Sequence, residues 1–279
     1  MPNLPNIRRG RQRNADPAPA SAPRAPDIQR RDAHGLTWIH IESPGDAEVR
    51  WLAENHDFHP LDLEDVQSRR RQRAKIDAYD EYIFVVLHFP RFNKGTGRLQ
   101  PEELNVFVAE GLIITIPNEP LKPLSALFSR VQDPDEAAKV MRKGSGYLFY
   151  AILDTMADYG FPILDKISFK LDTIEEEMFE GRNDDLVRDI SQVKQEILNY
   201  RKTIKPQRAV FRGLERYALT YATEDLELYY DDIVDKVERA YELLVYYREV
   251  ADARGATHVA VVARRVIAMD RCLTVRSGG

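Results

Sequence analysis

Apolar and polar positions alternate in the first half of the chain, over short segments that are separated by turn residues. Residues 95–97 and 110–111 carry hairpin turn signals, and hairpins require antiparallel pairing. A turn at 43–46 leads into a helix over 47–55. The sequence therefore predicts an α/β fold with a mixed or antiparallel sheet and flanking helices, and not a Rossmann unit. The predicted strands are 37–41, about 74–77, 82–89, 104–109 and 112–116.

After Pro120 the apolar spacing changes to steps of three and four, which is typical of amphipathic helices. We predict helices almost to the end of the chain, with breaks at 143–146, 181–183 and 205–206. The last long helix begins near Leu226 and carries a heptad seam, which favours lengthwise packing against another helix or another copy of the chain. The seam consists of Leu226, Tyr230, Ile233, Val237, Ala240, Leu244 and Tyr247.

Composition places the chain among globular proteins of a reducing compartment. Its 279 residues are 43% hydrophobic, enough for a real core in one or two domains. The single cysteine, Cys272, has no partner within the chain. The longest strongly apolar stretches, 113–116 and 259–263, are far shorter than the roughly 20 residues that a spanning helix needs. We therefore expect no transmembrane segment, and the net charge of −5 argues against a nucleic-acid partner.

The first residues differ in character from the rest of the chain. Residues 1–31 hold seven arginines and two aspartates in a background rich in proline and alanine. Such a segment cannot bury enough apolar surface to fold. We predict a disordered leader over 1–33 and assign it no site, with attachment to anionic lipid or RNA as the functional alternative.

Motifs for catalysis are missing: the chain has no G-x-S-x-G, no Gly-rich phosphate loop, no H-E-x-x-H and no Cys/His cluster at zinc spacing. His56 and His59 form H-x-x-H, but Pro60 follows at once and disfavours a helix across both. We predict a structural role for these histidines and no enzymatic activity.

Carboxylates carry the more informative chemistry. Glu64 and Asp65 stand together, and Asp154 lies within an otherwise apolar helical segment, where it needs either a partner or a cation. The acidic pair at 231–232 begins the heptad helix. Hard cations such as Mg²⁺ take oxygen ligands and keep several waters, so two or three converging carboxylates suffice for a regulatory site. An ion-paired structural role for Asp154 is the alternative.

The chain resembles the CorA-type magnesium transporter family over about residues 36–250, through several stretches in the same order. These stretches are Trp38-Ile-His-Ile, His59-Pro-Leu-Asp-Leu-Glu-Asp65, Lys75-Ile-Asp-Ala-Tyr-Asp-Glu-Tyr-Ile-Phe84, Tyr147-Leu-Phe-Tyr-Ala-Ile-Leu-Asp154, Arg201-Lys-Thr-Ile-Lys-Pro206 with Arg208, and Tyr229 to Arg248. The resemblance implies a funnel-shaped homopentamer whose subunits have an α/β domain, an antiparallel helix pair and a long C-terminal stalk helix. Family members bind Mg²⁺ between neighbouring cytosolic domains, which holds the pore closed.

Carried onto this chain, the resemblance implies four metal ligands. Asp65 of one subunit and Asp232 of its neighbour match the primary bridging site, while Glu64 and Asp154 match a weaker second site. It also implies the division into a leader at 1–33, an α/β cytosolic domain at 34–146, a helical arm at 147–224 and a truncated stalk and tail at 225–279.

The resemblance does not extend to the conducting part of the family. Met269-Asp270 is not the family's Gly-Met-Asn loop, and no pair of membrane helices is present. We therefore expect that this chain cannot conduct ions alone. Gly255 costs about 1 kcal/mol relative to alanine in a helix, and we expect the stalk to fray there.

Our leading hypothesis is a cytosolic Mg²⁺-sensing regulatory domain of a CorA-like transporter, located in the cytoplasm or at the cytoplasmic face of the membrane. One alternative is an interaction module that assembles with full-length CorA-like subunits. Another is the soluble domain of a zinc transporter of the same family. Co²⁺ and Zn²⁺ are the alternative ions, but the all-oxygen ligand set favours Mg²⁺.

Overall fold

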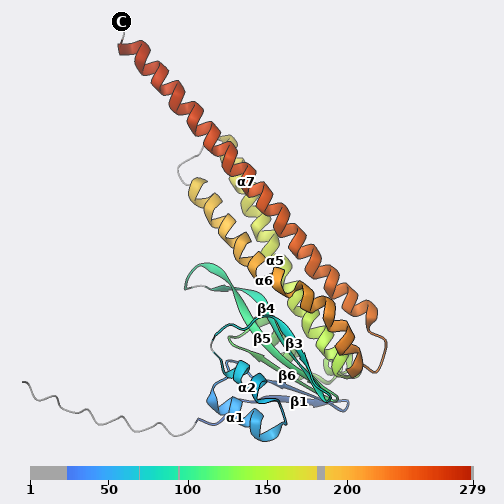
Figure 1. Ribbon diagram of the computed structural model, residues 1–279. Helices are drawn as coiled ribbons and strands as arrows, with labels where there is room; N and C mark the ends of the chain where they lie inside the picture. The colour runs from blue at the N-terminus through green and yellow to red at the C-terminus, as the bar shows by residue number, and fades with distance from the viewer. Residues whose placement is uncertain (1–23, 69, 94, 181–185, 278–279) are drawn as a thin grey trace, which may run out of the picture.

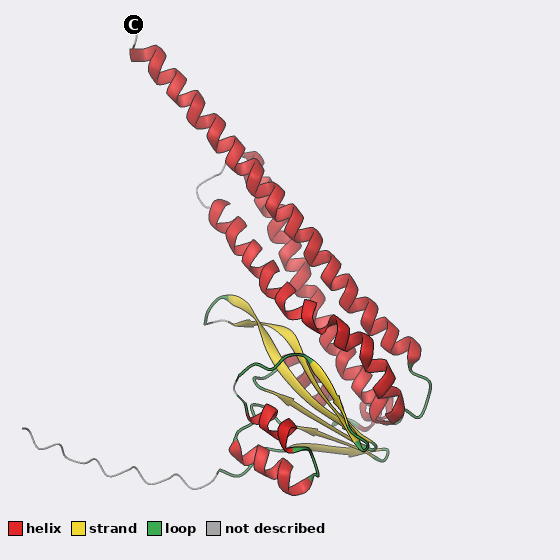
Figure 2. Cartoon of the chain, in the orientation of Figure 1, coloured by secondary structure: helices red, strands yellow, loops and turns green. Residues whose placement is uncertain are grey.

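The computed structural model describes residues 24–68, 70–93, 95–180 and 186–277. The strands are β1 (Gln29–Ala33), β2 (Leu36–His40), β3 (Lys75–Ala78), β4 (Tyr82–Asn93), β5 (Arg98–Ala109) and β6 (Leu112–Pro117). The helices are α1 (Asp46–Asn55), α2 (Pro60–Gln67), α3 (Lys122–Arg130), α4 (Pro134–Met141), α5 (Gly144–Glu180), α6 (Leu186–Ala218), the short 3₁₀ helix η1 (Leu219–Tyr221) and α7 (Glu227–Ser277). Figure 2 shows the sheet beside the long helices α5, α6 and α7.

The six strands form one mixed sheet in the order β1-β2-β6-β5-β4-β3. Only β2 and β6 pair in parallel among these strands, and the segment from α1 to β5 connects them. The other pairs are antiparallel, and the hairpin between β5 and β6 turns at Gly111, whose φ of +68° suits a residue without a side chain. The predicted fold class is confirmed.

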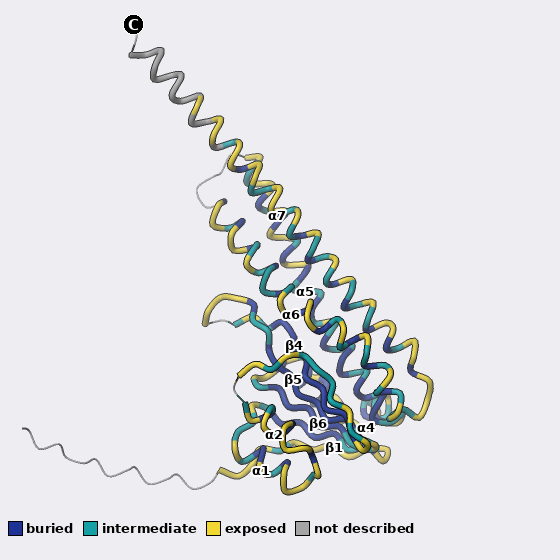
Figure 3. The backbone as a smooth tube through the Cα atoms, in the orientation of Figure 1, coloured by how far each residue is buried: buried dark blue, intermediate teal, exposed yellow. Residues whose placement is uncertain are grey.

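The sheet separates two hydrophobic cores. Along β4, alternate residues such as Ile83 and Val85 join the core beneath the long helices. Their neighbours Phe84 and Val86 face the smaller core under α1 and α2. The period of two follows from the strand pleat, and the central strands are buried on both faces (Figure 3).

The heptad seam of α7 is buried within its own chain. All seven of its residues are buried, and they join one core with residues of α5 and α6. Tyr230 also donates a hydrogen bond from its hydroxyl to the carbonyl of Gly146 on α5, at 2.8 Å. The prediction of lengthwise helix packing is confirmed, but the partners are α5 and α6, and the seam is not available to another copy of the chain.

Two expected helix breaks are wrong. α6 runs through Pro206, and α7 continues through Gly255. At Gly255 a Cβ atom would lie 3.1 Å from Nζ of Lys194 on α6, so the missing side chain makes room for a close contact that supports the helix. A similar approach joins α5 to α6 at Gly160, where a Cβ would lie 2.2 Å from the Tyr200 hydroxyl. The predicted break at 181–183 lies outside the described residues.

The predicted leader is too long at its C-terminal end. Residues 29–33 form β1, which pairs with β2, and Asp32 accepts a hydrogen bond from the Thr37 hydroxyl at 2.6 Å. Strand pairing therefore orders backbone that composition alone assigns to disorder. Residues 1–23 lie outside the described part of the chain. Among the described helices, none has the length and apolarity that a membrane span requires.

Candidate functional site

Glu64 and Asp65 lie on the short helix α2. His59 caps this helix, because its Nδ1 accepts a hydrogen bond from the backbone N–H of Leu61 at 3.2 Å, and proline occupies the first helical position. The histidine thus has the structural role expected for it. The side chain of Glu64 is exposed and has no hydrogen-bond or ion-pair partner among the described residues.

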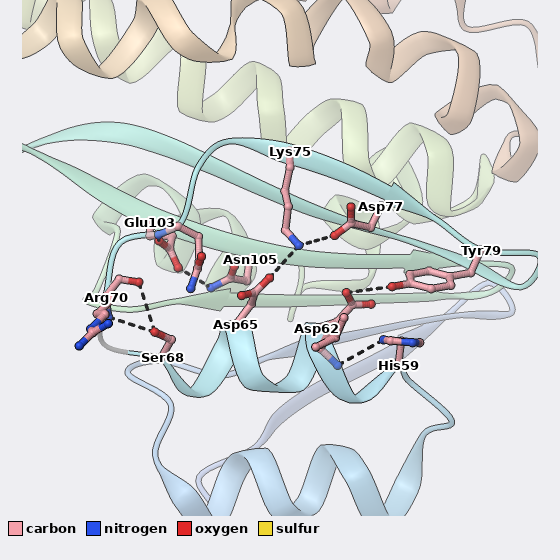
Figure 4. A network of polar contacts seen from close by, with 12 residues as sticks. His59, Asp62, Asp65, Ser68, Arg70, Lys75, Asp77, Tyr79, Glu103 and Asn105 are labelled. Atoms are coloured by element: carbon pink, nitrogen blue, oxygen red, sulfur yellow. Dashed lines mark hydrogen bonds and ion pairs between the residues drawn. The ribbon is translucent and has the colours of Figure 1, made fainter.

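Asp65 is neutralised within its own chain by a lysine of the neighbouring strand. Oδ2 of Asp65 lies 2.7 Å from Nζ of Lys75 on β3, and the same ammonium forms an ion pair with Asp77 (Figure 4). It also lies 5.3 Å from the centre of the Phe84 ring. Burial disfavours the ammonium, but the two carboxylates outweigh it and raise the pKa of Lys75. We call Asp65, Lys75 and Asp77 the Lys75 cluster.

Asp62 is a buried carboxylate that fixes the position of α2. One oxygen accepts a hydrogen bond from the Tyr79 hydroxyl at 3.1 Å (Figure 4), and the other accepts one from the Tyr82 hydroxyl at 2.8 Å. Burial raises the pKa of Asp62, and the tyrosine hydroxyls offset only part of that effect. Sequence analysis missed this residue, although one helical turn separates it from Asp65. Its bonds to the β3–β4 hairpin hold Asp65 beside Lys75.

Asp154 and Asp232 come together around a second lysine. Nζ of Lys236 forms an ion pair with Asp154, lies 3.0 Å from Oδ1 of Asp158, and lies 3.4 Å from Oδ2 of Asp232. Two of the three carboxylates come from α5 and one from α7. Burial disfavours the ammonium, but the carboxylates outweigh it and raise the pKa of Lys236. We call these four residues the Lys236 cluster.

The spacing of the Lys236 cluster explains how it forms and which signals the sequence carried. Asp154 and Asp158 are four residues apart on α5, and Asp232 and Lys236 are four residues apart on α7, so each pair shares a helix face. The packing of α7 on α5 brings the two faces together. Sequence analysis proposed an ion pair or a cation for Asp154, and the structure shows the ion pair.

Asp65 and Asp232 do not meet within one chain. α1 and α2 cover one face of the sheet, while the long helices cover the other (Figure 1). In the part of the chain that the structure describes, no group of three or more His, Cys, Asp or Glu side chains is arranged to hold a metal ion. The donor set itself, carboxylate oxygens at partly exposed positions, has the chemistry of a Mg²⁺ site.

Comparison with known proteins decides the family. The family model described as CorA-like Mg²⁺ transporter protein matches residues 33–277, most of the chain. The chain belongs to this family. The putative metal ion transporter YfjQ of Bacillus subtilis is 28% identical, over 86% of this chain and 73% of that protein. The cobalt/magnesium transport protein CorA of Thermotoga maritima is 24% identical, over 88% of this chain and 69% of that protein.

The fold agrees with that of a solved family structure. The soluble domain of CorA from Methanocaldococcus jannaschii superposes with a TM-score of 0.68 and 19% identity, over 79% of this chain and 86% of that one. This CorA-family chain therefore has the soluble-domain fold, and its four candidate ligands divide between two lysine-neutralised clusters and one exposed glutamate. Within one copy, the ammonium groups of Lys75 and Lys236 compensate part of the negative charge of the two clusters.

Proposed function

We propose that this chain is the cytoplasmic, Mg²⁺-sensing regulatory domain of a CorA-family transporter, and that Mg²⁺ bridges neighbouring copies through Asp65 and Asp232. One observation carries the proposal. The two aspartates belong to clusters on opposite faces of the sheet, so a shared ion requires two chains (Figure 1). Family membership makes divalent-cation transport the process in which such a domain acts.

In the proposed mechanism, Lys75 and Lys236 stabilise the state in which no Mg²⁺ is bound. Without Mg²⁺, Lys75 and Lys236 each compensate part of the negative charge of their own carboxylates, and the copies have no cation between them. A divalent ion at the interface competes for the same oxygens with twice the charge of an ammonium. Because the ion binds the joined arrangement better than separate copies, raising its concentration shifts the population toward that arrangement.

The Lys236 cluster has more negative charge left for a cation than the Lys75 cluster. Its ammonium faces three carboxylates, whereas Lys75 faces two. We infer that the stalk side of the interface supplies most of the attraction for the ion, and that α2 supplies the second, bridging ligand. Glu64, exposed beside Asp65, extends the acidic surface toward the neighbouring copy.

Two alternatives are weaker on this geometry. The clusters contain oxygen ligands and no imidazole or thiol, which favours Mg²⁺ over Zn²⁺ and Co²⁺. The second alternative is co-assembly with full-length subunits through the heptad seam. It is weaker because α5 and α6 of the same chain cover that seam, which is therefore not exposed to a partner. A homopentamer remains the assembly that we propose, with its contacts made by the acidic surfaces.

The test is a MgCl₂ titration of the purified chain, followed by thermal unfolding and sedimentation. Wild type and the control Asp231→Asn, which changes an exposed neighbouring carboxylate, should gain stability and mass with Mg²⁺. An ion at a hundred times its dissociation constant adds about 2.7 kcal/mol. Asp65→Asn and Asp232→Asn should each lose both responses. Equal responses in all four proteins, or none in wild type, would contradict the proposal.

A further inference from the structure

A cleft of about 830 Å³ opens between the sheet and α6. Its walls come from residues 71–74, from β4 and β5 and from α6, segments that are far apart in the sequence. This volume lies within the range of roughly 300–1,000 Å³ that small-molecule sites occupy. The cleft contains no member of the Lys75 or Lys236 cluster.

Four cations line the cleft, and none of them has an ion-pair partner in the described part of the chain. They are Arg71, Arg73, Arg98 and Lys202. No aspartate or glutamate is among the described residues that line the cleft, and none of the four cationic side chains forms an ion pair or hydrogen bond with a described residue. Like charges in a concave site raise the local positive potential and attract anions.

The acidic group nearest the floor does not neutralise these cations. Glu103 is buried, and it accepts hydrogen bonds from the backbone N–H of Gln72 at 2.8 Å and from the amides of Asn105 and Asn118 at 3.2 Å each. Burial disfavours its charge, but hydrogen bonds and the neighbouring His88 outweigh burial and lower the pKa of Glu103. Its carboxylate is therefore held by local donors and forms no ion pair with the four cations. The charge of Arg71 also acts on Glu102, which is ion-paired with Arg91.

The lining of the cleft also includes His88, whose Nε2 lies beside the buried carboxylate of Glu103. The backbone of His88 is fixed by Gln207 of α6, whose amide accepts from the His88 N–H at 2.9 Å and donates to its carbonyl at 2.6 Å. Nε2 of His88 is buried, and its ion-pair contact is Oε2 of Glu103 at 3.5 Å, at the limit of a hydrogen bond. His88 therefore ties β4 to α6 at the cleft, and its ring nitrogen is not a free ligand for an anion.

We propose that this cleft binds a phosphate-bearing anion of nucleotide size, a nucleoside polyphosphate. The forked guanidinium groups suit phosphate oxygens. The amides of Gln195 and Asn199 and the hydroxyl of Thr203 line the same space. Each donates one hydrogen bond within the protein, and the second amide hydrogens and the lone pairs of Gln195 and Thr203 leave capacity to bind a sugar or base. Leu99 and Pro206 supply an apolar wall. This site is independent of the proposed cation bridge, since the two share no residue.

The test uses calorimetric titration of the whole chain with ATP, AMP and inorganic phosphate, in EDTA so that the cation site stays empty. We expect ATP to bind, with affinity that falls as salt rises. Lys202→Gln and Arg98→Gln should each weaken ATP binding about tenfold. Lys205→Gln is the matched control, since it removes the same charge from an exposed position on α6 outside the cleft, and it should leave the affinity unchanged.

The remaining outcomes each decide against part or all of the proposal. No ATP binding, or equal weakening by all three substitutions, would overturn the site. Inorganic phosphate that binds as tightly as ATP would overturn the nucleotide-sized ligand and assign the cleft to free phosphate. Unfolding curves for each variant establish that a lost affinity is not a lost fold.

Discussion

The two sides of α6 differ in whether their cationic side chains are paired with a carboxylate. Toward α7, Arg208 and Arg212 share Glu238, with Nε of Arg208 at 3.0 Å and a terminal nitrogen of Arg212 at 2.8 Å from Oε1. Toward the sheet, Lys202 joins three arginines of the cleft and meets no carboxylate among the described residues. One helix therefore carries both a neutralised face and a face with excess charge.

This difference separates charges that hold the fold together from charges that are free to bind something else. An ion pair between two helices stabilises their packing and leaves little field outside. Cations that cluster without a counter-charge repel one another, so they contribute nothing favourable to folding by themselves. The three substitutions below test this distinction, beginning with the largest expected effect.

Lys236→Met should cause the largest loss of stability. It leaves three neighbouring carboxylates without their ammonium, so we expect unfolding to become easier by about 2 kcal/mol, between the typical costs of breaking surface and buried pairs. Added Mg²⁺ should restore more stability to the variant than to wild type. Thermal unfolding in EDTA and in MgCl₂ measures both effects. Lys166→Met, at an exposed position of α5, is the control. If Lys236→Met lost no more stability than this control, the ion pairs of Lys236 would not contribute to holding the helices together.

Glu238→Gln should have a smaller, pH-dependent effect. The hydrogen bond from Arg208, followed by the charges of both arginines, holds the pKa of Glu238 below its ordinary value. Its stabilisation is therefore complete above the ordinary glutamate pKa, about 4.3, and is lost as pH falls through the lowered folded value. We expect the variant to be less stable by about 1 kcal/mol at pH 7 and to converge with wild type in acid. Melting curves from pH 7 to pH 3 test this, and a constant difference would contradict it.

Arg98→Gln should change stability least. The side chain has no ion pair to lose among the described residues, and its removal relieves repulsion in the cleft. The free energy of unfolding should stay within about 0.5 kcal/mol of wild type, as for most surface positions, with any gain confined to low salt. Urea unfolding at two NaCl concentrations measures it. A loss comparable with that of Lys236→Met would show that the cleft cations are structural.

The strands, the long helices and the buried seam of α7 were predictable because each depends on a local period. A pleat repeats every two residues and a helix turn every 3.6, so the buried face shows in the order of apolar residues. Prediction from local patterns failed where tertiary contacts stabilise residues that are unfavourable in the secondary structure they adopt. Pro206 lies within α6, Gly255 lies within α7, and residues 29–33 become a strand because β2 offers them an edge.

For the candidate site, the family resemblance pointed to Asp65 and Asp232 as metal ligands, which remains a prediction, and the apolar surroundings of Asp154 in the sequence indicated that it needs a partner. Only the tertiary structure decided the partners. Lys236 reaches Asp154 across 82 positions of the chain, and the cleft collects cations from segments that the sequence keeps apart. Burial follows local periodicity, whereas the pairing of charges depends on which distant segments pack together, and that is set by the whole fold.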